Sequence, residues 1–365
     1  MLTYCQLQLR NFDLDCGGLR VVKSFRIVWI LSICLSAVAG VSATDNSFKL
    51  DFNGDGRTDI AVYREGSRGI DAPQPSIWYF LDTTNGFPYS VQWGRSLDVP
   101  APADYDGDGK TDVGIFRWWD YERGDTNEWW LSRPLLTPGH KVLNALELGY
   151  NKYSRNYVGD ARAEVGQIYQ VDMSQNPGET CFISVYMIAD GDYNFVIRKI
   201  VGDVCNVNPT PVPGDYDGDG RSEIAVYVDQ QFKVWLPPYS LGYTAPPYRH
   251  WMPVDTPAPG DYDGDGRTDF AGIKAVNGRM IWRYRKSSTG EEKEVDFGLA
   301  TDVAVPGDYD GDGTTDFAIF RRSDQSWWIY NSGSGAVHTF IYGQATDIPL
   351  AAHVIPFDPV RQPVK

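Results

Sequence analysis

The sequence predicts an all-β fold, a β-propeller of six four-stranded blades, and three observations lead to this prediction. An acidic motif, which reads GDYDGDG in three of its five copies, recurs along the chain with its last two spacings at 46 and 47 residues. Each copy is followed by runs of four to eight residues, rich in Val, Ile, Tyr, Phe and Trp and bounded by turn formers, which are typical of strands. Four strands in a unit of 46–56 residues cannot bury both faces alone, so neighbouring units must stack.

Each unit repeats one order of elements, which the first unit illustrates. Its acidic loop comes after a short lead-in segment and is followed by an apolar run at residues 60–63. A Trp-centred run at 77–80 comes next, then an Asn-Gly turn at 85–86, and a last run that ends in Trp-Gly at 93–94. Because residues 44–365 show no helical periodicity of useful length, we expect only strands and turns.

A sixth unit is hidden between the second and third intact motifs, which begin at Asp104 and Asp215. Their spacing of 111 residues is about twice the others. The stretch GDARAEV at residues 159–165 matches an intact motif with its central loop removed, and Asp160 divides the gap almost equally. We therefore expect a single domain over residues 44–365. Its repeats begin near residues 48, 100, 156, 211, 257 and 304.

Residues 348–356 (IPLAAHVIP) resemble one more lead-in segment, but no acidic loop follows them. Two interpretations fit this stretch. It is either a strand that returns to the first unit and closes the propeller, or the beginning of a seventh blade. We favour six blades with a closing strand at 348–356.

The first 43 residues predict a secretory signal peptide. Lys23 and Arg26 precede an apolar run at 27–41, and the small residues Val-Ser-Ala at 41–43 are typical of a cleavage site. The run is shorter than the roughly 20 residues of a bilayer-spanning helix, and a retained membrane anchor is the alternative. We expect a secreted protein, extracellular or periplasmic, that is a monomer.

The charge of the chain argues against two classes of partner. Cleavage would remove four basic and two acidic residues, which changes the formal charge from −15 to −17. Nucleic acids and anionic membranes would repel such a surface, so we expect neither as a partner. The excess of carboxylates indicates instead bound cations or high solubility.

Three of the five cysteines lie in the predicted signal segment, which leaves Cys181 and Cys205. In an exported chain, a lone pair of cysteines predicts one disulfide. Closing a loop of about 25 residues would contribute roughly 3–4 kcal/mol in the chain-entropy treatment. Two buried free thiols are the alternative.

The acidic loops have the oxygen spacing of a cation site. In the fifth unit, side-chain oxygens stand at positions 1, 3, 5 and 9 of the loop, which are Asp261, Asp263, Asp265 and Asp269, and position 7, Arg267, offers its backbone carbonyl. Glycine at position 6 permits the turn that directs these oxygens to one centre. Without a cation, the clustered carboxylates would raise one another's pKa and destabilise the fold.

Calcium is the cation that this donor set favours. Zinc would require Cys or His, and magnesium retains most of its waters. An EF-hand begins with the same residues but needs Glu at position 12, where these loops have Val, Ile or Gly, and it needs flanking helices. Solvated acidic loops without metal are a further alternative, which five copies with the same oxygen spacing disfavour.

The repeated unit resembles the FG-GAP/VCBS repeat of integrin α-subunits and many secreted bacterial proteins. The resemblance lies in D-Y-D-G-D-G, followed by Ser or Thr, an acidic residue and an apolar strand. The resemblance covers about residues 48–357 and implies a calcium loop between the first and second strands of a blade. It also implies about five calcium ions, one for each intact loop, and none in the third unit, where only Asp160 and Glu164 remain. The implied ligands, with the position-7 carbonyls, are Asp51, Asn53, Asp55, Arg57 and Asp59; Asp104, Asp106, Asp108, Lys110 and Asp112; Asp215, Asp217, Asp219, Arg221 and Glu223; Asp261, Asp263, Asp265, Arg267 and Asp269; and Asp308, Asp310, Asp312, Thr314 and Asp316.

The resemblance implies adhesion or ligand binding, so we expect a non-enzymatic binding module for an extracellular protein or glycan. Aromatic stretches at 117–122 and 239–248 are suited to such contacts, whereas a Trp at the same place in each unit is expected to fill the packing between blades. A calcium-dependent polysaccharide lyase or hydrolase is the alternative, but carboxylates are too numerous to nominate a catalytic pair. A purely structural role is a third possibility.

Overall fold

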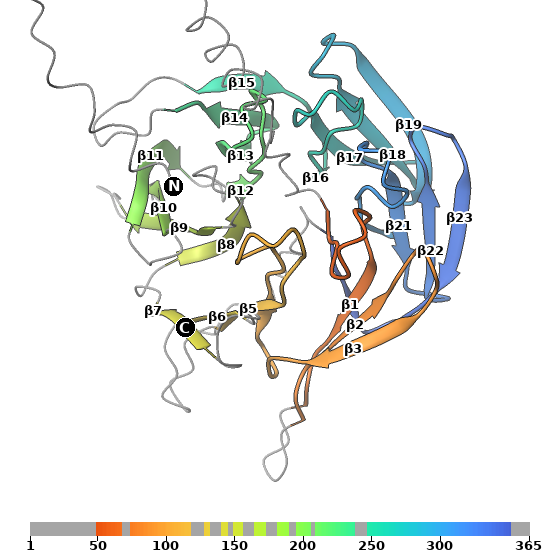
Figure 1. The fold of residues 1–365 in the computed structure, drawn as a ribbon. Helices are drawn as coiled ribbons and strands as arrows, with labels where there is room; N and C mark the ends of the chain where they lie inside the picture. The colour runs from red at the N-terminus through yellow and green to blue at the C-terminus, as the bar shows by residue number, and fades with distance from the viewer. Residues whose placement is uncertain are drawn as a thin grey trace, which may run out of the picture. The chain divides into compact units, whose positions relative to one another are not determined.

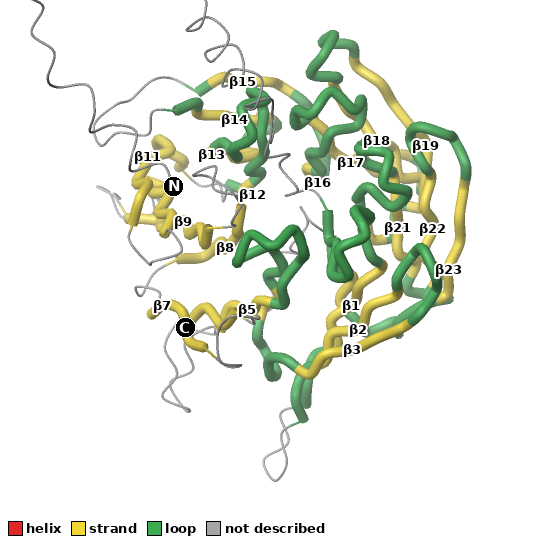
Figure 2. The backbone as a smooth tube through the Cα atoms, in the orientation of Figure 1, coloured by secondary structure: helices red, strands yellow, loops and turns green. Residues whose placement is uncertain are grey.

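The computed structural model describes residues 49–67, 74–117, 128–131, 140–144, 149–155, 164–172, 181–189, 195–205, 209–237 and 247–351, of which those between 128 and 205 are described by their backbone. The predicted signal segment at 1–43 and Asp160 lie outside these ranges. The described part of the chain consists of strands and loops (Figure 2). Within it, no helix offers the length and apolar character that crossing a bilayer requires.

The strands of the described ranges form six four-stranded sheets. Strands adjacent in sequence are hydrogen-bonded in them, apart from one strand that comes from the end of the chain (Figure 1). The first three sheets contain β24 (Ile348–Pro349), β1 (Ile60–Arg64), β2 (Ile77–Leu81) and β3 (Pro88–Gln92); β4 (Val99–Pro100), β5 (Gly114–Arg117), β6 (Glu128–Leu131) and β7 (His140–Asn144); and β8 (Gly149–Arg155), β9 (Glu164–Asp172), β10 (Cys181–Ala189) and β11 (Phe195–Cys205). The other three contain β12 (Thr210–Pro211), β13 (Ile224–Val228), β14 (Gln231–Trp235) and β15 (Tyr248–Trp251); β16 (Thr256–Pro257), β17 (Phe270–Val276), β18 (Arg279–Arg285) and β19 (Glu292–Leu299); and β20 (Val303–Ala304), β21 (Phe317–Arg321), β22 (Ser326–Tyr330) and β23 (Val337–Ile341).

Burial decreases from the second strand of a sheet to the fourth. In the first sheet, β1 is buried at four of its five residues, β2 alternates, and every residue of β3 is exposed. The last sheet has the same gradient from β21 to β23. This gradient follows the sequence, because the runs after the acidic loops are continuously apolar while the outer strands carry polar residues. The prediction of an all-β fold is confirmed for the described residues.

The first sheet takes its inner strand from the end of the chain. β24 pairs antiparallel with β1, with Val62 opposite Pro349 and Tyr63 opposite Ile348. β4 pairs with β5 in the second sheet in the same manner, with Val99 opposite Phe116. The predicted closing segment thus contains a strand that takes the place that β4, β12, β16 and β20, the two-residue lead-in strands, have in the second, fourth, fifth and sixth sheets.

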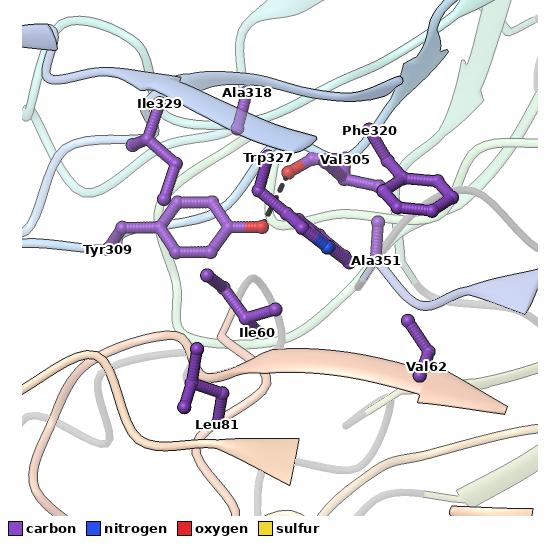
Figure 3. Packing of buried hydrophobic residues seen from close by; sticks show 10 residues of the cluster. All are labelled: Ile60, Val62, Leu81, Val305, Tyr309, Ala318, Phe320, Trp327, Ile329 and Ala351. Carbon is purple, nitrogen blue, oxygen red and sulfur yellow. Dashed lines mark hydrogen bonds between the residues drawn. The ribbon is translucent and has the colours of Figure 1, made fainter. Parts of the chain in front are cut away.

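The cores lie between consecutive sheets. One cluster joins Ile60, Val62 and Leu81 of the first sheet with residues of the last, including Phe320 and Trp327 (Figure 3). Comparable clusters join the first and second, fourth and fifth, and fifth and sixth sheets. Burial of this apolar area between sheets is the main force that holds them together.

The recurring Trp residues fill these cores, as predicted. Trp78, Trp282 and Trp327 are at most 1% exposed. Each indole Nε1–H donates to the backbone carbonyl fifteen residues later, at 3.0, 2.9 and 3.1 Å respectively, at the aromatic residue that precedes the closing glycine. The indole therefore ties the third strand to the end of the fourth while its ring packs between sheets.

A second tie recurs at the other end of the strands, and sequence analysis did not predict it. The last residue of β21, Arg321, donates two hydrogen bonds to the carboxylate of Asp302, at 3.0 and 2.8 Å, and Asp302 is 8% exposed. Arg117 holds Asp98 and Arg64 holds Asp347 through the same pair of bonds. Each aspartate stands just before the inner strand, so the pair fixes the chain as it enters the sheet.

The third sheet contains the two remaining cysteines. β10 and β11 are antiparallel, and their register places Cys181 directly opposite Cys205. Residues directly opposite each other in an antiparallel pair have Cα atoms about 4.5–5.5 Å apart, which lies within the range that a disulfide spans.

Candidate metal centre

Each of the five acidic loops leads into the second strand of its sheet, and the loops share one backbone geometry. In the fifth unit, Oδ1 of Asp261 accepts the N–H groups of Gly264 and Asp265 at 2.6 and 3.2 Å, and its Oδ2 accepts the N–H of Gly266 at 2.8 Å. Gly264 and Gly266 have φ of 74° and 82°, a left-handed conformation that glycine adopts without strain. The alternation of aspartate and glycine thus bends the loop around the position-1 carboxylate.

In the four loops other than the first, which has Phe52 there, a tyrosine at position 2 anchors the loop in the core. Tyr309 is 4% exposed, and its hydroxyl donates to the carbonyl of Val305 at 2.8 Å (Figure 3). Tyr262 and Tyr216 make the same bond to the carbonyl four residues earlier, at 2.9 and 2.7 Å. The aromatic ring holds the loop in place between the apolar strands, which explains why the motif alternates Tyr with Asp.

The carboxylate at position 9 is buried beneath the loop. In the fifth unit, Oδ2 of Asp269 accepts the N–H of Tyr262 at 3.0 Å, and Oδ1 accepts the N–H of Ser287 at 2.6 Å. Asp269 is fully buried, as are Asp316 and Glu223. Because this residue immediately precedes the second strand, the sheet itself positions its side chain against the loop.

The structure brings most of the predicted ligands together. Among the described residues, carboxylate oxygens lie within 4.8 Å of one another in four of the five loops, and the fourth unit gathers all four of its carboxylates. These groups are Asp215, Asp217, Asp219 and Glu223; Asp104, Asp106 and Asp108; Asp261, Asp263 and Asp265; and Asp308, Asp310 and Asp316. The first loop, in which Asn53 replaces an aspartate, is not among them.

Burial strongly perturbs the position-9 carboxyls. Burial raises the pKa of Asp59, Asp112, Asp269 and Asp316 to about 7. The neighbouring aspartates reinforce this shift, and hydrogen bonds to the charged form oppose it. The same cause raises the pKa of Glu223 to about 9. Without a positive charge beside them, Glu223 would be protonated near neutral pH and the four aspartates would be only partly ionised.

The donor atoms fit a hard cation. Oε1 of Glu223 is buried and has no hydrogen-bond partner, and the same is true of Oδ1 of Asp263. A buried carboxylate oxygen without a donor is costly, whereas coordination to a cation would satisfy it. All side-chain donors of the five loops are oxygens, the ligand type of Ca²⁺ and Mg²⁺.

Sequence analysis missed a second set of residues over the loops, in the turn between the third and fourth strands. Ser287 and Ser288 donate through their hydroxyls to Asp265 and Asp263 in the fifth unit. In the sixth, the Nδ2 of Asn331 donates to Asp310 at 2.6 Å. The signal was present as a Ser, Thr or Asn pair at the same place in several units, but only the fold shows that it faces the loop.

Consecutive loops are joined by their backbones. The N–H of Thr315 donates to the carbonyl of Asp261 at 2.6 Å, and the N–H of Thr268 donates to that of Asp215 at 2.6 Å. The last loop is joined to the first in the same way, since the N–H of Thr58 donates to the carbonyl of Asp308 at 2.7 Å. The acidic loops therefore form a continuous series of neighbours rather than isolated sites.

The position-7 side chains extend this series. A Cβ built on Gly218 would lie 2.8 Å from Nε of Arg267 in the next unit, and one on Gly54 would lie 2.7 Å from Cε of Lys110. The cationic side chain of one loop thus lies across position 4 of the preceding loop, where it offsets part of the carboxylate charge. Coordination of the cation by the backbone carbonyl at position 7 stays a prediction.

The comparisons with known proteins agree with this geometry. The FG-GAP-like repeat matches residues 51–115 and 261–319, which contain four of the five acidic loops. Comparison with curated proteins yields no match.

Two solved structures are similar in part. A protein from Lactobacillus plantarum is 13% identical with a TM-score of 0.38, and the alignment covers 78% of this chain and 82% of that one. A putative 6-phosphogluconolactonase from Bacteroides fragilis is 9% identical with a TM-score of 0.36, with 82% and 97% covered. At such TM-scores, neither likeness carries a statement about this chain. The described part of the chain therefore contains FG-GAP-like repeats at residues 51–115 and 261–319 and has the sheet arrangement of a β-propeller.

Proposed function

We propose that this protein is an exported, calcium-stabilised β-propeller that acts as a non-enzymatic binding module for an extracellular protein or glycan. One observation carries the proposal: the same acidic loop closes over a buried carboxylate in unit after unit, and in the fourth unit a buried oxygen of Glu223 has no donor. Calcium would supply the missing positive charge. The side chains at positions 1, 3, 5 and 9 would hold the ion, together with the carbonyl at position 7.

The metal has a structural role in this proposal. The loops sit where one sheet meets the next, and each is hydrogen-bonded to its neighbour. Removing the repulsion within a loop therefore also strengthens the contact between sheets. A rigid propeller of this kind would present its outer strands and turns as a binding surface.

The number of blades is part of the proposal. Six sheets closed by β24 are supported by the hydrogen bond from Thr58 to Asp308, which repeats the contact between consecutive loops. A disulfide between Cys181 and Cys205, which the register of β10 and β11 would allow, would brace the third unit, where the acidic loop is shortest.

The outer strands support the binding role. Several large apolar side chains are exposed there, including Ile341 at 79%, Trp251 at 62% and Tyr248 at 52%. Aromatic side chains exposed on a rigid scaffold are typical of interaction surfaces.

The metal part of the proposal is tested by calorimetry and native mass spectrometry on the mature chain. We expect about five calcium ions, a higher melting temperature in calcium than in EGTA, and a smaller effect of magnesium. Asp263→Ala combined with Asp265→Ala should remove one ion, while Asp296→Ala, on the exposed face of β19, should remove none. Equal melting temperatures with saturating calcium and with EGTA would overturn the proposal.

The binding part is tested separately, on glycan and extracellular-protein arrays at fixed free calcium. Retention of a ligand that is lost in EGTA is the expected result. Release of unsaturated or reducing ends from a bound polysaccharide would instead establish the enzymatic alternative. An array on which nothing binds would contradict the binding role while leaving the calcium sites intact.

A further inference from the structure

A groove of about 500 Å³ lies between the fourth and fifth sheets. One wall is formed by the acidic loop of the fourth unit together with residues in or next to β14 and β15. The other wall is formed by the start of β17 and the turn between β18 and β19. Its volume is within the range of small-molecule sites. None of the recurring contacts described above accounts for it.

One wall carries an aromatic ring with a free face. Tyr248 is 52% exposed, and its ring stacks on Phe270 with centroids 5.8 Å apart and planes at 16°. Tyr216 stacks on the same phenyl ring at 5.1 Å and 22°. Phe270 thus packs against one face of Tyr248 from the other wall, and this contact holds the exposed tyrosine ring in place, so it presents a flat surface at little entropic cost.

The opposite wall is cationic. Arg285 and Lys286 line the groove together with Arg267, and Asp217 is the acidic residue of the lining. The guanidinium of Arg285 is fixed by bonds from Nε to the carbonyl of Gly290 at 3.3 Å and from NH1 to the hydroxyl of Tyr248 at 3.2 Å. Three cations in one groove stand out in a chain with a formal charge of −15.

Hydroxyl groups complete the lining. Ser288 and Thr289 stand at the turn beside the cations, and Ser288 also donates to Asp263 of the acidic loop. The groove therefore combines an aromatic surface, fixed cations and small polar groups. The apolar face of a sugar ring stacks on a flat aromatic, its hydroxyls pair with polar side chains, and an acid substituent pairs with a guanidinium.

We propose that this groove binds an acidic saccharide, with a sugar ring against Tyr248 and its carboxylate or sulfate on Arg285 and Lys286. The inference rests on the proposed function as a binding module and specifies the ligand class. An acidic peptide would satisfy the cations but would leave the free face of Tyr248 unused, so the sugar is the better match. Asp217 belongs to the acidic loop of the fourth unit, and Ser288 covers the acidic loop of the fifth. In this proposal the shape of the groove therefore depends on calcium in those two loops.

The test uses isothermal titration of the mature protein at fixed free calcium. The probes are trigalacturonate, a chondroitin sulfate disaccharide, maltotriose as the neutral sugar, and a triglutamate peptide. Binding of one or both acidic sugars, with maltotriose and triglutamate at least tenfold weaker, is the expected result. The two acidic sugars distinguish carboxylate from sulfate as the recognised group.

Variants then locate the site. Arg285→Met should weaken the acidic sugar about tenfold or more, since a charge-assisted hydrogen bond is lost, and Tyr248→Ala should do the same. Arg279→Met is the matched control, because Arg279 lies on the same strand but pairs with Asp296 on the exposed surface. Melting temperatures in calcium within about 2 °C of the parent would show that the variants fold.

Three outcomes would overturn the assignment. They are equal affinity for triglutamate and the acidic sugars, unchanged affinity in Arg285→Met, and no binding of either acidic sugar. If other ligands still bind on the arrays in these cases, the groove assignment fails and the binding module stands. If nothing binds on the arrays either, the proposed function fails with it.

Discussion

The substitution Glu223→Gln distinguishes between two roles of Glu223, that of a metal ligand and that of a purely structural residue. Glu223 is fully buried, and burial raises the pKa of its carboxyl to about 9. In the metal-free protein at pH 7.5 the side chain is therefore protonated, and glutamine closely reproduces its shape and charge. Glutamine can also retain the bonds that Oε2 accepts from the N–H groups of Tyr216 and Asp217, at 2.7 and 3.2 Å.

The metal-bound state should respond very differently. Glutamine removes a negative charge and one ligand oxygen from the only loop of the described part that gathers four carboxylates. Loss of one site that is otherwise saturated at 100 times its Kd costs about 2.7 kcal/mol of stabilisation. For a large domain, this corresponds to a decrease of about 5 °C in melting temperature.

The assay is differential scanning calorimetry of the parent and the variant, each in excess calcium and in EGTA. We expect the two proteins to melt within about 2 °C of each other in EGTA, and the variant to melt about 5 °C lower in calcium with one ion fewer by native mass spectrometry. Glu292→Gln, an exposed change near the rim of the groove, should have no effect in either buffer. An equal loss in both buffers would show that Glu223 is structural, and an unchanged ion count would show that it is not a ligand.

Three further predictions concern pH, the strand-end ion pairs and the cysteines. In EGTA, the free energy of unfolding should fall as pH rises from about 4 to 7, because the folded state binds more protons than the unfolded state in that window. Each carboxyl such as Asp269 should contribute up to about 1.4 kcal/mol per pH unit to this fall. Calcium should abolish the fall, and a free energy of unfolding that rises with pH in EGTA would contradict the prediction. Arg321→Met should lower the free energy of unfolding measured in urea by about 3–5 kcal/mol, since Asp302 is left buried and unpaired, whereas Arg321→Met with Asp302→Asn should recover part of the loss. Reduction of a Cys181–Cys205 disulfide should lower the free energy of unfolding by about 3 kcal/mol, and an intact mass that shows two free thiols before reduction would exclude it.

The recurring features of this fold are those that sequence analysis could predict. The oxygen positions of the acidic loops are set by local spacing, so the convergence of Asp215, Asp217, Asp219 and Glu223 follows directly from the motif. The burial of Trp78, Trp282 and Trp327 was equally predictable, because these residues occupy the same place in their units. A feature that recurs at the same place in several units is more informative than a single occurrence.

The contacts between elements could not be predicted in this way. The donation from Asn331 to Asp310, and the pairing of Arg321 with Asp302, join residues about 20 positions apart, and their geometry depends on how each turn folds back over the sheet. Tyr248 and Arg285 of the groove lie outside the repeated acidic motif, so repetition gave no signal for it. Polar residues at turns have many possible partners, and only tertiary packing selects among them.

The supply of an inner strand by Ile348–Pro349 has a consequence for how the chain matures. Until its last segment is available, β1 remains an open edge with unpaired backbone groups, and such an edge invites pairing with other molecules. The first sheet to be synthesised is thus among the last to be completed, and the nascent protein depends on its own far end to be protected from aggregation. A chain that ended at Asp347, 18 residues shorter, would lose that protection while every acidic loop remained in place.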